Sequence, residues 1–168
     1  EATFFDAFGN ELEVAKRRDF KDVAAVDGFS LYLDNRVLYY KYVPTQYPYT
    51  VEFTYEIETS DTGFFPPWYF LSGYGISVQQ SEYSIVYPSI EFKPIVKEKN
   101  LENVQVEKTD IAGSLQYSAT NIPAMEAESL SPSFSLLAPS LSIRLPKFHY
   151  KGYQAVVNDW HEMGIWIQ

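Results

Sequence analysis

The sequence has no cysteine, so a disulfide framework, a thiolate zinc site and a cysteine nucleophile are excluded within its 168 residues. Basic residues are few: 13 Lys and Arg stand against 22 Asp and Glu, and the net charge of -9 repels nucleic acid and anionic lipid. Long apolar runs are also missing, because no stretch approaches the roughly 18 residues that span a bilayer. We therefore expect no nucleic-acid partner and no membrane span.

Aromatic residues are abundant. They make up 17% of the chain, with 14 Tyr and 12 Phe, and these residue types fit a pleated, half-buried surface better than a helix. A chain of 168 residues can bury a core as one domain without metals or disulfides. Composition thus favours a single all-β domain.

The clearest strand is predicted at residues 49–59, where apolar and polar residues alternate. A period of two residues is typical of an antiparallel sheet with one buried and one solvated face. A hairpin is predicted from residues 3–8 and 11–16, which flank a Gly-Asn turn. The apolar positions of the clearest strand, predicted to be buried, are Tyr49, Val51, Phe53, Tyr55 and Ile57.

Short strands with turn residues between them continue along the chain, with no long helical pattern. The aromatic, Pro-containing residues 64–70 are predicted to cross between sheets. This pattern predicts an antiparallel β-sandwich or barrel, and we favour a two-sheet sandwich, supersandwich-like, over residues 1–152. Its further strands are predicted at residues 36–43, 76–80, 82–87, 91–96, 105–108, 114–120 and 141–144.

The last residues, 153–168, break the strand pattern. An apolar stripe at helical spacing predicts an amphipathic helix that acts as a connector or docking device. The stripe consists of Val156, Trp160, Met163 and Ile167. We expect this helix to lead into a further domain that lies outside these residues.

One possible metal site lies in this helix, where His161-Glu162 matches the start of a zinc-protease motif. That motif needs a second histidine one turn later, but Ile165 occupies the position. The other histidine, His149, has no predicted place near the helix. No metal or cofactor site is therefore predicted.

Two other candidate chemistries are weak. Glu126 and Glu128 are two residues apart, so on a strand they would share one face as a glycosidase carboxylate pair does. Adjacent glutamates are more often solvated or cap backbone amides. The serines at residues 129–142 lack a nucleophile elbow and are typical of loops. We predict no catalytic residue in this segment.

The surplus of aromatic residues offers a different role. More of them are present than one face of a few strands can bury, and flat aromatic patches bind sugars or partner proteins. Packing in the core and sheets is the favoured alternative. The residues concerned are Tyr39, Tyr40, Tyr42, Tyr47, Tyr49, Trp68, Tyr69 and Tyr74.

Several stretches together resemble a bacterial domain of unknown function that precedes a transglutaminase-like domain of the papain-type cysteine-protease superfamily in exported proteins. No single stretch is diagnostic, but their order and spacing run along nearly the whole chain. They are Tyr-Leu-Asp-Asn-Arg-Val at 32–37, Tyr-Pro-Tyr-Thr-Val-Glu-Phe-Thr-Tyr-Glu at 47–56, Pro67-Trp68, Asn-Ile-Pro-Ala-Met-Glu-Ala-Glu at 121–128 and Asp-Trp-x-x-x-Gly-x-Trp at 159–166.

The resemblance implies an all-β sandwich, a periplasmic or cell-surface location, and a neighbouring domain in the same polypeptide that carries Cys, His and Asp. It also implies further strands before Glu1. The leading hypothesis is a non-catalytic sandwich that positions its neighbour or helps to recognise its substrate. The alternatives are a free-standing glycan- or peptide-binding module and, third, a hydrolase that uses Glu126 and Glu128.

Overall fold

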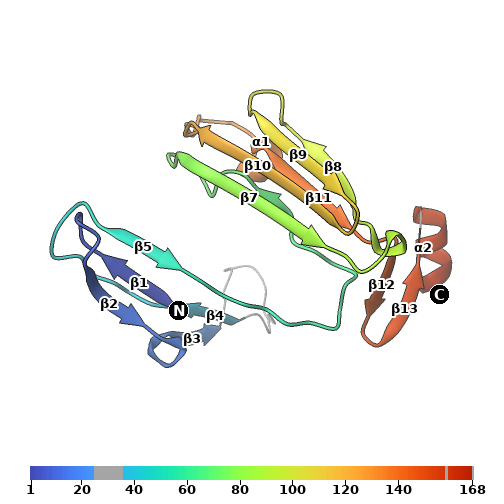
Figure 1. The fold of residues 1–168 in the computed structure, drawn as a ribbon, viewed down its shortest axis with the longest axis horizontal. Coiled ribbons are helices and arrows are strands. Elements are labelled where there is room, and N and C mark those ends of the chain that lie inside the picture. The colour runs from blue at the N-terminus through green and yellow to red at the C-terminus, as the bar shows by residue number, and fades with distance from the viewer. Residues whose placement is uncertain (25–35, 158, 168) are drawn as a thin grey trace. The chain divides into compact units, whose positions relative to one another are not determined.

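The described residues form antiparallel strands and two short α-helices, which confirms the predicted all-β fold class. The computed structural model describes residues 1–24, 36–157 and 159–167, with the backbone alone at residues 160 and 167. Residues 32–35 of the first resembling stretch lie outside this range. The chain divides into two compact units, Glu1–Glu58 and Thr59–Gln168, and each is described by itself (Figure 1).

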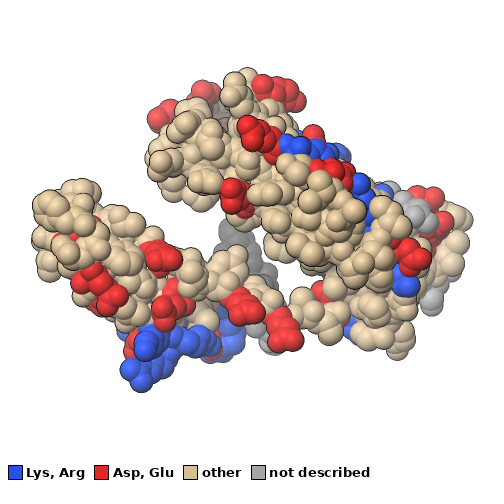
Figure 2. Space-filling model, viewed as in Figure 1, with Lys and Arg blue, Asp and Glu red and all other residues tan. Residues whose placement is uncertain are grey.

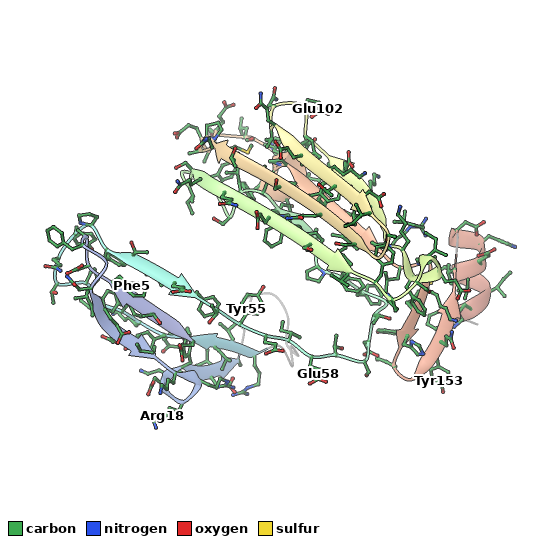
Figure 3. All side chains as sticks on the ribbon, viewed as in Figure 1. Phe5, Arg18, Tyr55, Glu58, Glu102 and Tyr153 are labelled. Atoms are coloured by element: carbon green, nitrogen blue, oxygen red, sulfur yellow. The ribbon has the colours of Figure 1, made fainter. Side chains whose placement is uncertain are left out.

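The first unit contains a sheet in the order β2-β1-β5 and a separate β3-β4 ladder. The predicted hairpin is confirmed as β1 and β2: the Asp6 carboxylate accepts the N–H groups of Phe8 and Asn10 at 2.8 and 2.9 Å, and Gly9 supplies a φ of 84°. The strands are β1 (Ala2–Phe5), β2 (Glu11–Ala15), β3 (Lys21–Ala24), β4 (Arg36–Tyr39) and β5 (Thr50–Phe53), and a 3-10 turn spans Arg17–Asp19. Figure 3 labels Arg18 in that turn, and Figure 2 shows basic atoms gathered there.

A small apolar core supports this unit. Phe4 is buried with Ala2 and Ala15, and its ring stacks on that of Tyr42 with centroids 3.9 Å apart. Phe20 and Tyr40 pack against the same cluster. The unit is therefore held by a few aromatic contacts over one sheet.

The burial predicted for residues 49–59 is wrong. Strand β5 ends at Phe53, and four of the five apolar positions predicted to be buried are exposed in the first unit: Val51 46%, Phe53 58%, Tyr55 75% and Ile57 76%. The fifth, Tyr49, is half-buried. An alternating pattern specifies which side chains share a face of the strand, whereas burial needs a second layer over that face. Within the described first unit, the rings on Phe53 are those of Phe20 and Tyr55 alone.

The second unit contains a two-sheet sandwich of six strands, in agreement with the sandwich-like all-β fold class predicted for the chain (Figure 1). One sheet has the order β7-β10-β9 and the other β6-β11-β8. The central strands β10 and β11 supply much of the core, because Leu115, Tyr117, Leu141 and Ile143 are all buried between the sheets. The strands are β6 (Trp68–Tyr69), β7 (Val78–Val86), β8 (Ile95–Lys99), β9 (Val106–Ile111), β10 (Ser114–Ile122) and β11 (Ser140–Arg144).

Two predicted strand boundaries in this unit are wrong. The strands predicted at 76–80 and 82–87 are one strand, β7, because no Gly, Pro or Asn interrupts the ladder there. The strand predicted at 91–96 begins later, at Ile95. Residues Ile90–Phe92 form a 3-10 turn instead, and Pro94 cannot donate to a ladder.

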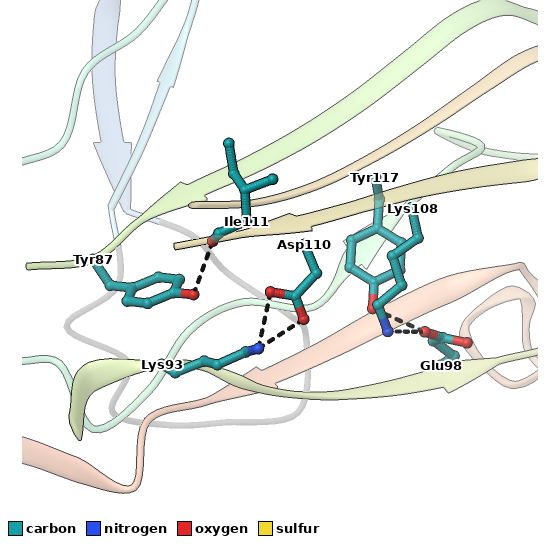
Figure 4. Close-up of polar contacts among 7 residues, drawn as sticks. All are labelled: Tyr87, Lys93, Glu98, Lys108, Asp110, Ile111 and Tyr117. Atoms are coloured by element: carbon teal, nitrogen blue, oxygen red, sulfur yellow. Dashed lines mark hydrogen bonds and ion pairs between the residues drawn. The ribbon is translucent and has the colours of Figure 1, made fainter. Parts of the chain in front are cut away.

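Ion pairs join the two sheets along one side of the sandwich, between β8 and β9 (Figure 4). The Glu98 carboxylate on β8 accepts the Tyr117 hydroxyl at 2.8 Å and the Lys108 ammonium at 3.0 Å. Lys93, just before β8, contacts both carboxylate oxygens of Asp110 on β9, at 2.7 and 2.9 Å. Tyr117 is only 1% exposed, so Glu98 satisfies a hydroxyl that is buried in the core.

The Glu98 contacts shift the pKa values of their members. The Lys108 ammonium and then the Tyr117 hydroxyl lower the pKa of Glu98 below its ordinary value. Burial raises the pKa of Tyr117, and the Tyr117 hydroxyl and Glu98 together raise the pKa of Lys108. The carboxylate and the ammonium are thus both held in their charged forms.

A hairpin and two helices complete the second unit. They are α1 (Phe134–Leu137), β12 (Lys147–Tyr150), β13 (Tyr153–Val156) and α2 (Trp160–Ile167). The helix predicted from residue 153 begins later, because Lys151 and Gly152, with φ of 49° and 85°, reverse the chain into β13. Val156 is therefore a strand residue, 60% exposed, and not part of a helical stripe. Neither α1 nor α2, the α-helices of the described residues, is long and apolar enough to cross a bilayer.

Leu141→Ala should destabilise the protein strongly, because Leu141 is 0% exposed between the sheets. Truncating a buried leucine costs about 3 kcal/mol through lost burial and the cavity that remains. Urea unfolding followed by circular dichroism measures the change. The matched control is Leu136→Ala on α1, which is 57% exposed and should cost well under 1 kcal/mol. Equal losses in both variants would contradict the core assignment.

Glu98→Gln should lower stability by about 1 kcal/mol at neutral pH, a figure discounted because the carboxylate is 44% exposed. The pKa of Glu98 is lowered in the folded state, so its contribution is present above the unfolded pKa and is lost as pH falls through the folded pKa. The gap in stability between wild type and variant should therefore narrow as the pH falls below the ordinary pKa of a glutamate and through the lowered pKa of Glu98. Thermal unfolding at several pH values measures it, with exposed Glu107→Gln on β9 as control. A gap that is constant with pH would refute the pairing.

Candidate functional site

The helix α2 is held against the β12-β13 hairpin by an apolar cluster. Phe148, Ala155 and Val157 are buried, and Met163 and Trp166 of the helix pack on them. The Trp166 ring meets the Phe148 ring edge-on, with centroids 5.6 Å apart and an angle of 74°. The predicted amphipathic helix is therefore present, but Trp166 anchors it together with Met163. The predicted roles of the Trp160 and Ile167 side chains lie outside the described residues.

Asp159 starts this helix. Its carboxylate accepts the Glu162 N–H at 2.8 Å, and its carbonyl accepts the Met163 N–H at 3.1 Å. An aspartate at this position pairs one of the free amides of the first turn. The Asp and the last Trp of the resembling stretch at 159–166 thus have structural roles.

The start of the second unit is fastened to the same hairpin. The His149 carbonyl accepts the N–H groups of Thr62 and Gly63 at 2.9 and 3.1 Å, and the Asp61 carboxylate accepts the Lys151 N–H at 2.8 Å. A Cβ on Gly63 would lie 3.0 Å from the Phe148 ring, so any larger residue here would force that ring to shift. The hairpin therefore holds residues 61–63 and α2 together.

A cavity of about 440 Å³ lies where β11, the hairpin and α2 meet. Apolar side chains form much of its wall, and Arg144 and Asp159 add one charge of each sign. The remaining residues around it are Gly63, Leu145, Phe148, Val157 and Met163. An opening of this size and chemistry can take an apolar side chain from a neighbouring domain or peptide.

The stretch at 121–128 lies beside a second cavity, of about 340 Å³. Ile122 is buried, Met125 packs on the core, and the Met125 carbonyl accepts the Gly75 N–H at 2.9 Å. Pro123 cannot continue the ladder, and β10 ends at Ile122. The idea that Glu126 and Glu128 share one face of a strand is therefore wrong, and both are exposed outside the strands.

The structure places both histidines in the module that the hairpin and α2 form. His149 is on β12 and His161 is on α2, and both are exposed. Among the described residues, no group of three or more His, Asp and Glu could hold a metal ion. The serines at 129–142 include Ser140, which is buried in β11, and Ser133 and Ser135, which contact each other at 3.1 Å at the start of α1. Among the described residues, the Ser133 and Ser135 hydroxyls contact each other and no His, Asp or Glu side chain.

The aromatic residues singled out in the sequence separate into two groups. Trp68 contacts Tyr83 at a tilted angle of 35°, with centroids 5.2 Å apart, and packs on the sandwich core, and Tyr74 packs edge-on against Phe134. Tyr47, by contrast, is 77% exposed at the end of a row that continues through Tyr49. Packing thus accounts for most of them, and Tyr47 is available at the surface.

The comparison with protein families gives one match. A family model for a domain of unknown function, DUF3857, covers residues 1–126. The chain belongs to the DUF3857 family. No curated protein and no solved structure matches it significantly. The matched residues of this DUF3857 chain end within the stretch at 121–128 and so precede β11, the hairpin and α2.

Trp166→Ala should release α2 from the hairpin without unfolding the sandwich, because Trp166 contacts the cluster around Phe148 and not the core between the sheets. Hydrogen exchange of the α2 amides should accelerate at least tenfold, the loss expected for about 1.5 kcal/mol of packing. Ile165→Ala on the same helix is the control, since Ile165 is 62% exposed. Unchanged exchange in Trp166→Ala would contradict the anchoring.

Proposed function

We propose that this chain is a non-catalytic β domain of an exported protein and that it positions a transglutaminase-like domain in the same polypeptide. Membership of the DUF3857 family supports the proposal, as do the stretches at 121–128 and 159–166 that resemble such domains. The neighbouring domain would supply the Cys, His and Asp of catalysis. The present chain would supply a rigid attachment.

The anchoring of α2 carries the proposal. One face of the helix is fastened through Met163 and Trp166, while His161, Gly164 and Ile165 are exposed on another. A connector fastened in this way fixes the orientation of whatever it joins or touches, because bending at its base would break the Trp166–Phe148 contact. A flexible tether would need no such packing.

Gly164 adds a second observation. Glycine inside a helix costs roughly 1 kcal/mol relative to alanine. Apart from the two chain neighbours of Gly164 and the backbone of its own helix, no atom of the described residues lies within 4 Å of the Cβ that Gly164 lacks. Packing of the described residues therefore gives no reason for a glycine there. Close approach of a neighbouring domain to this exposed face would give one.

The first test is the reading frame beyond Gln168. It should continue into a domain with Cys, His and Asp in the arrangement of a transglutaminase-like fold. A stop codon shortly after Gln168 would refute the proposal. This observation requires only the parent gene.

The second test is Gly164→Ala, made both in this chain and in the full polypeptide. In this chain the variant should raise the stability of α2 by up to about 1 kcal/mol. In the full polypeptide the added methyl group should obstruct the docked neighbour, so that the two domains unfold less cooperatively in calorimetry. Ile165→Val on the same face is the milder control. Stabilisation of equal size in both contexts would show that nothing docks against this face.

A further inference from the structure

The strand β7 forms one edge of its sheet, and a row of its backbone groups has no partner among the residues that the structure describes. Its partner is β10, and no other strand of the described residues pairs with it. The Tyr87 N–H donates to the Gly113 carbonyl at 3.0 Å, and this pair continues the register of β7 and β10. Tyr87 therefore directs its backbone groups towards the β10 side. Hydrogen-bonded and non-hydrogen-bonded pairs alternate in an antiparallel ladder. Ile85, Tyr83 and Ser81 therefore also face β10 with their backbone groups.

The alternate residues of β7 face outwards. The N–H and C=O groups of Gln80, Glu82, Ser84 and Val86 point away from β10, along the open edge. The side chains of the same four residues are exposed, whereas Ser81 is buried and Tyr83 packs on the core. The edge thus presents eight backbone hydrogen-bonding groups beside a partly covered core.

The sequence of β7 does nothing to block this edge. Proteins usually protect an edge strand by shortness, a Pro, a Lys or a bulge. The nine residues of β7 contain no Pro and no Lys, their register with β10 is regular, and Glu82 is their one charged residue. By this criterion β7 is a ready site for strand addition.

The two long sides of the sandwich differ. On the β8-β9 side the ion pairs of Glu98 and Asp110 bridge the sheets (Figure 4). On the β6-β7 side the bridge is the contact between the Trp68 and Tyr83 rings. The buried indole N–H of Trp68 has no hydrogen-bond partner among the described residues. The polar groups on the β6-β7 side are therefore less completely hydrogen-bonded than those on the β8-β9 side.

The charged residues on the outer face of the β7-β10-β9 sheet indicate which peptide sequences can pair with β7. The outward residues of β7, β10 and β9 share one face of the sheet, and the register places Glu82 and Glu107 on it, on either side of Ser118. No Lys or Arg belongs to this set: Lys108 points to the opposite face, where it contacts Glu98. Glu82 accepts the Gln80 side-chain amide at 2.8 Å and has no ion-pair partner within the described chain. The full set is Gln80, Glu82, Ser84, Val86, Glu107, Thr109, Ile111, Ser114, Gln116, Ser118 and Thr120.

We propose that β7 binds an extended peptide segment of a partner protein as an added antiparallel strand, with a Lys or Arg of that segment opposite Glu82. The outer side chains of the segment would be polar, beside Gln80 and Ser84. Its inner side chains would be apolar and would extend the core beside Tyr83 and Ile85. Backbone hydrogen bonds supply affinity in this mode of recognition, and the alternating side chains supply specificity.

Pairing of β7 with a second copy of itself fits less well. The central antiparallel register would set Glu82 opposite Glu82, and like charges directly opposite are destabilising. The net charge of -9 opposes association of two copies as well. A segment that has a basic residue opposite Glu82 and alternating polar and apolar side chains meets neither obstacle.

The test uses the 168-residue chain and a nine-residue peptide of alternating Thr and Val with a central Lys. Exchange of the Gln80, Glu82 and Ser84 amide protons, followed by NMR, should slow at least tenfold when the peptide saturates the site. The amides of Ser81 and Tyr83, already bonded to β10, should change little. If the three outward amides keep their exchange rates, strand addition at β7 is excluded.

Two N-methylated peptides of equal composition are the matched controls. In the first peptide, the methylated amides belong to the Thr two residues before Lys and the Thr two residues after it, which face β7. Methylation there should weaken binding roughly tenfold or more, because it removes two hydrogen bonds. In the second peptide, the methylated amides belong to the Val directly before Lys and the Val directly after it. These amides point away from β7, so binding should be almost unchanged. Equal affinities of the two peptides would overturn the proposal.

A charge exchange tests the position of the basic residue. Glu82→Lys should weaken the Lys peptide and favour the same peptide with Glu at its centre, by about fivefold in each direction for one cross-strand pair. A preference that does not reverse would reject the Glu82 contact. Protection of the same amides that rises with protein concentration, without peptide, would assign the edge to a second copy and overturn the partner assignment.

Discussion

The Tyr117 hydroxyl lies inside the sandwich and must be paired, and much of the second unit follows from that requirement. A buried hydroxyl without a partner costs one to several kcal/mol, roughly as much as a well-packed apolar residue contributes. Its partner is Glu98, on the other sheet, and Lys108 neutralises the resulting charge. These contacts hold β8 against β9 and β10 in one register. Apolar residues around Leu141 could pack in several ways, whereas the polar contact is directional.

The same contacts make the sandwich asymmetric. The β8-β9 side carries ion pairs between the sheets and has Lys on both of its edge strands. The β6-β7 side relies on the tilted contact between Trp68 and Tyr83, and the open backbone of β7 carries no Lys. A sandwich whose edge strands are protected on one side only can accept an added strand on its other side. The acidic, Lys- and Arg-free outer face then restricts which strands would fit.

The family boundary and the structural boundaries do not coincide. The DUF3857 match covers residues 1–126, yet β11, at Ser140–Arg144, is the central strand of one sheet of the second unit. Leu141 and Ile143 from that strand complete the core around Tyr117. Without β11, the matched residues would cover the apolar face of the β7-β10-β9 sheet only in part, through β6, β8 and the buried Phe70 and Leu71. The hairpin and α2, which also follow the matched residues, form a separate apolar cluster around Phe148.

The sequence by itself determined the fold class, the hairpin at Asp6, the position of most strands and the existence of the closing helix, because these depend on residue type and local periodicity. It could not determine that β5 remains exposed, that Val156 belongs to a strand, or that Trp166 anchors the helix, since each depends on which segment packs over it. The pairing of Glu98 with Tyr117 and Lys108 was equally hidden, for its members come from three strands. The open edge of β7 was decided by sheet order alone. Sheet order is a long-range property, and no local pattern encodes it.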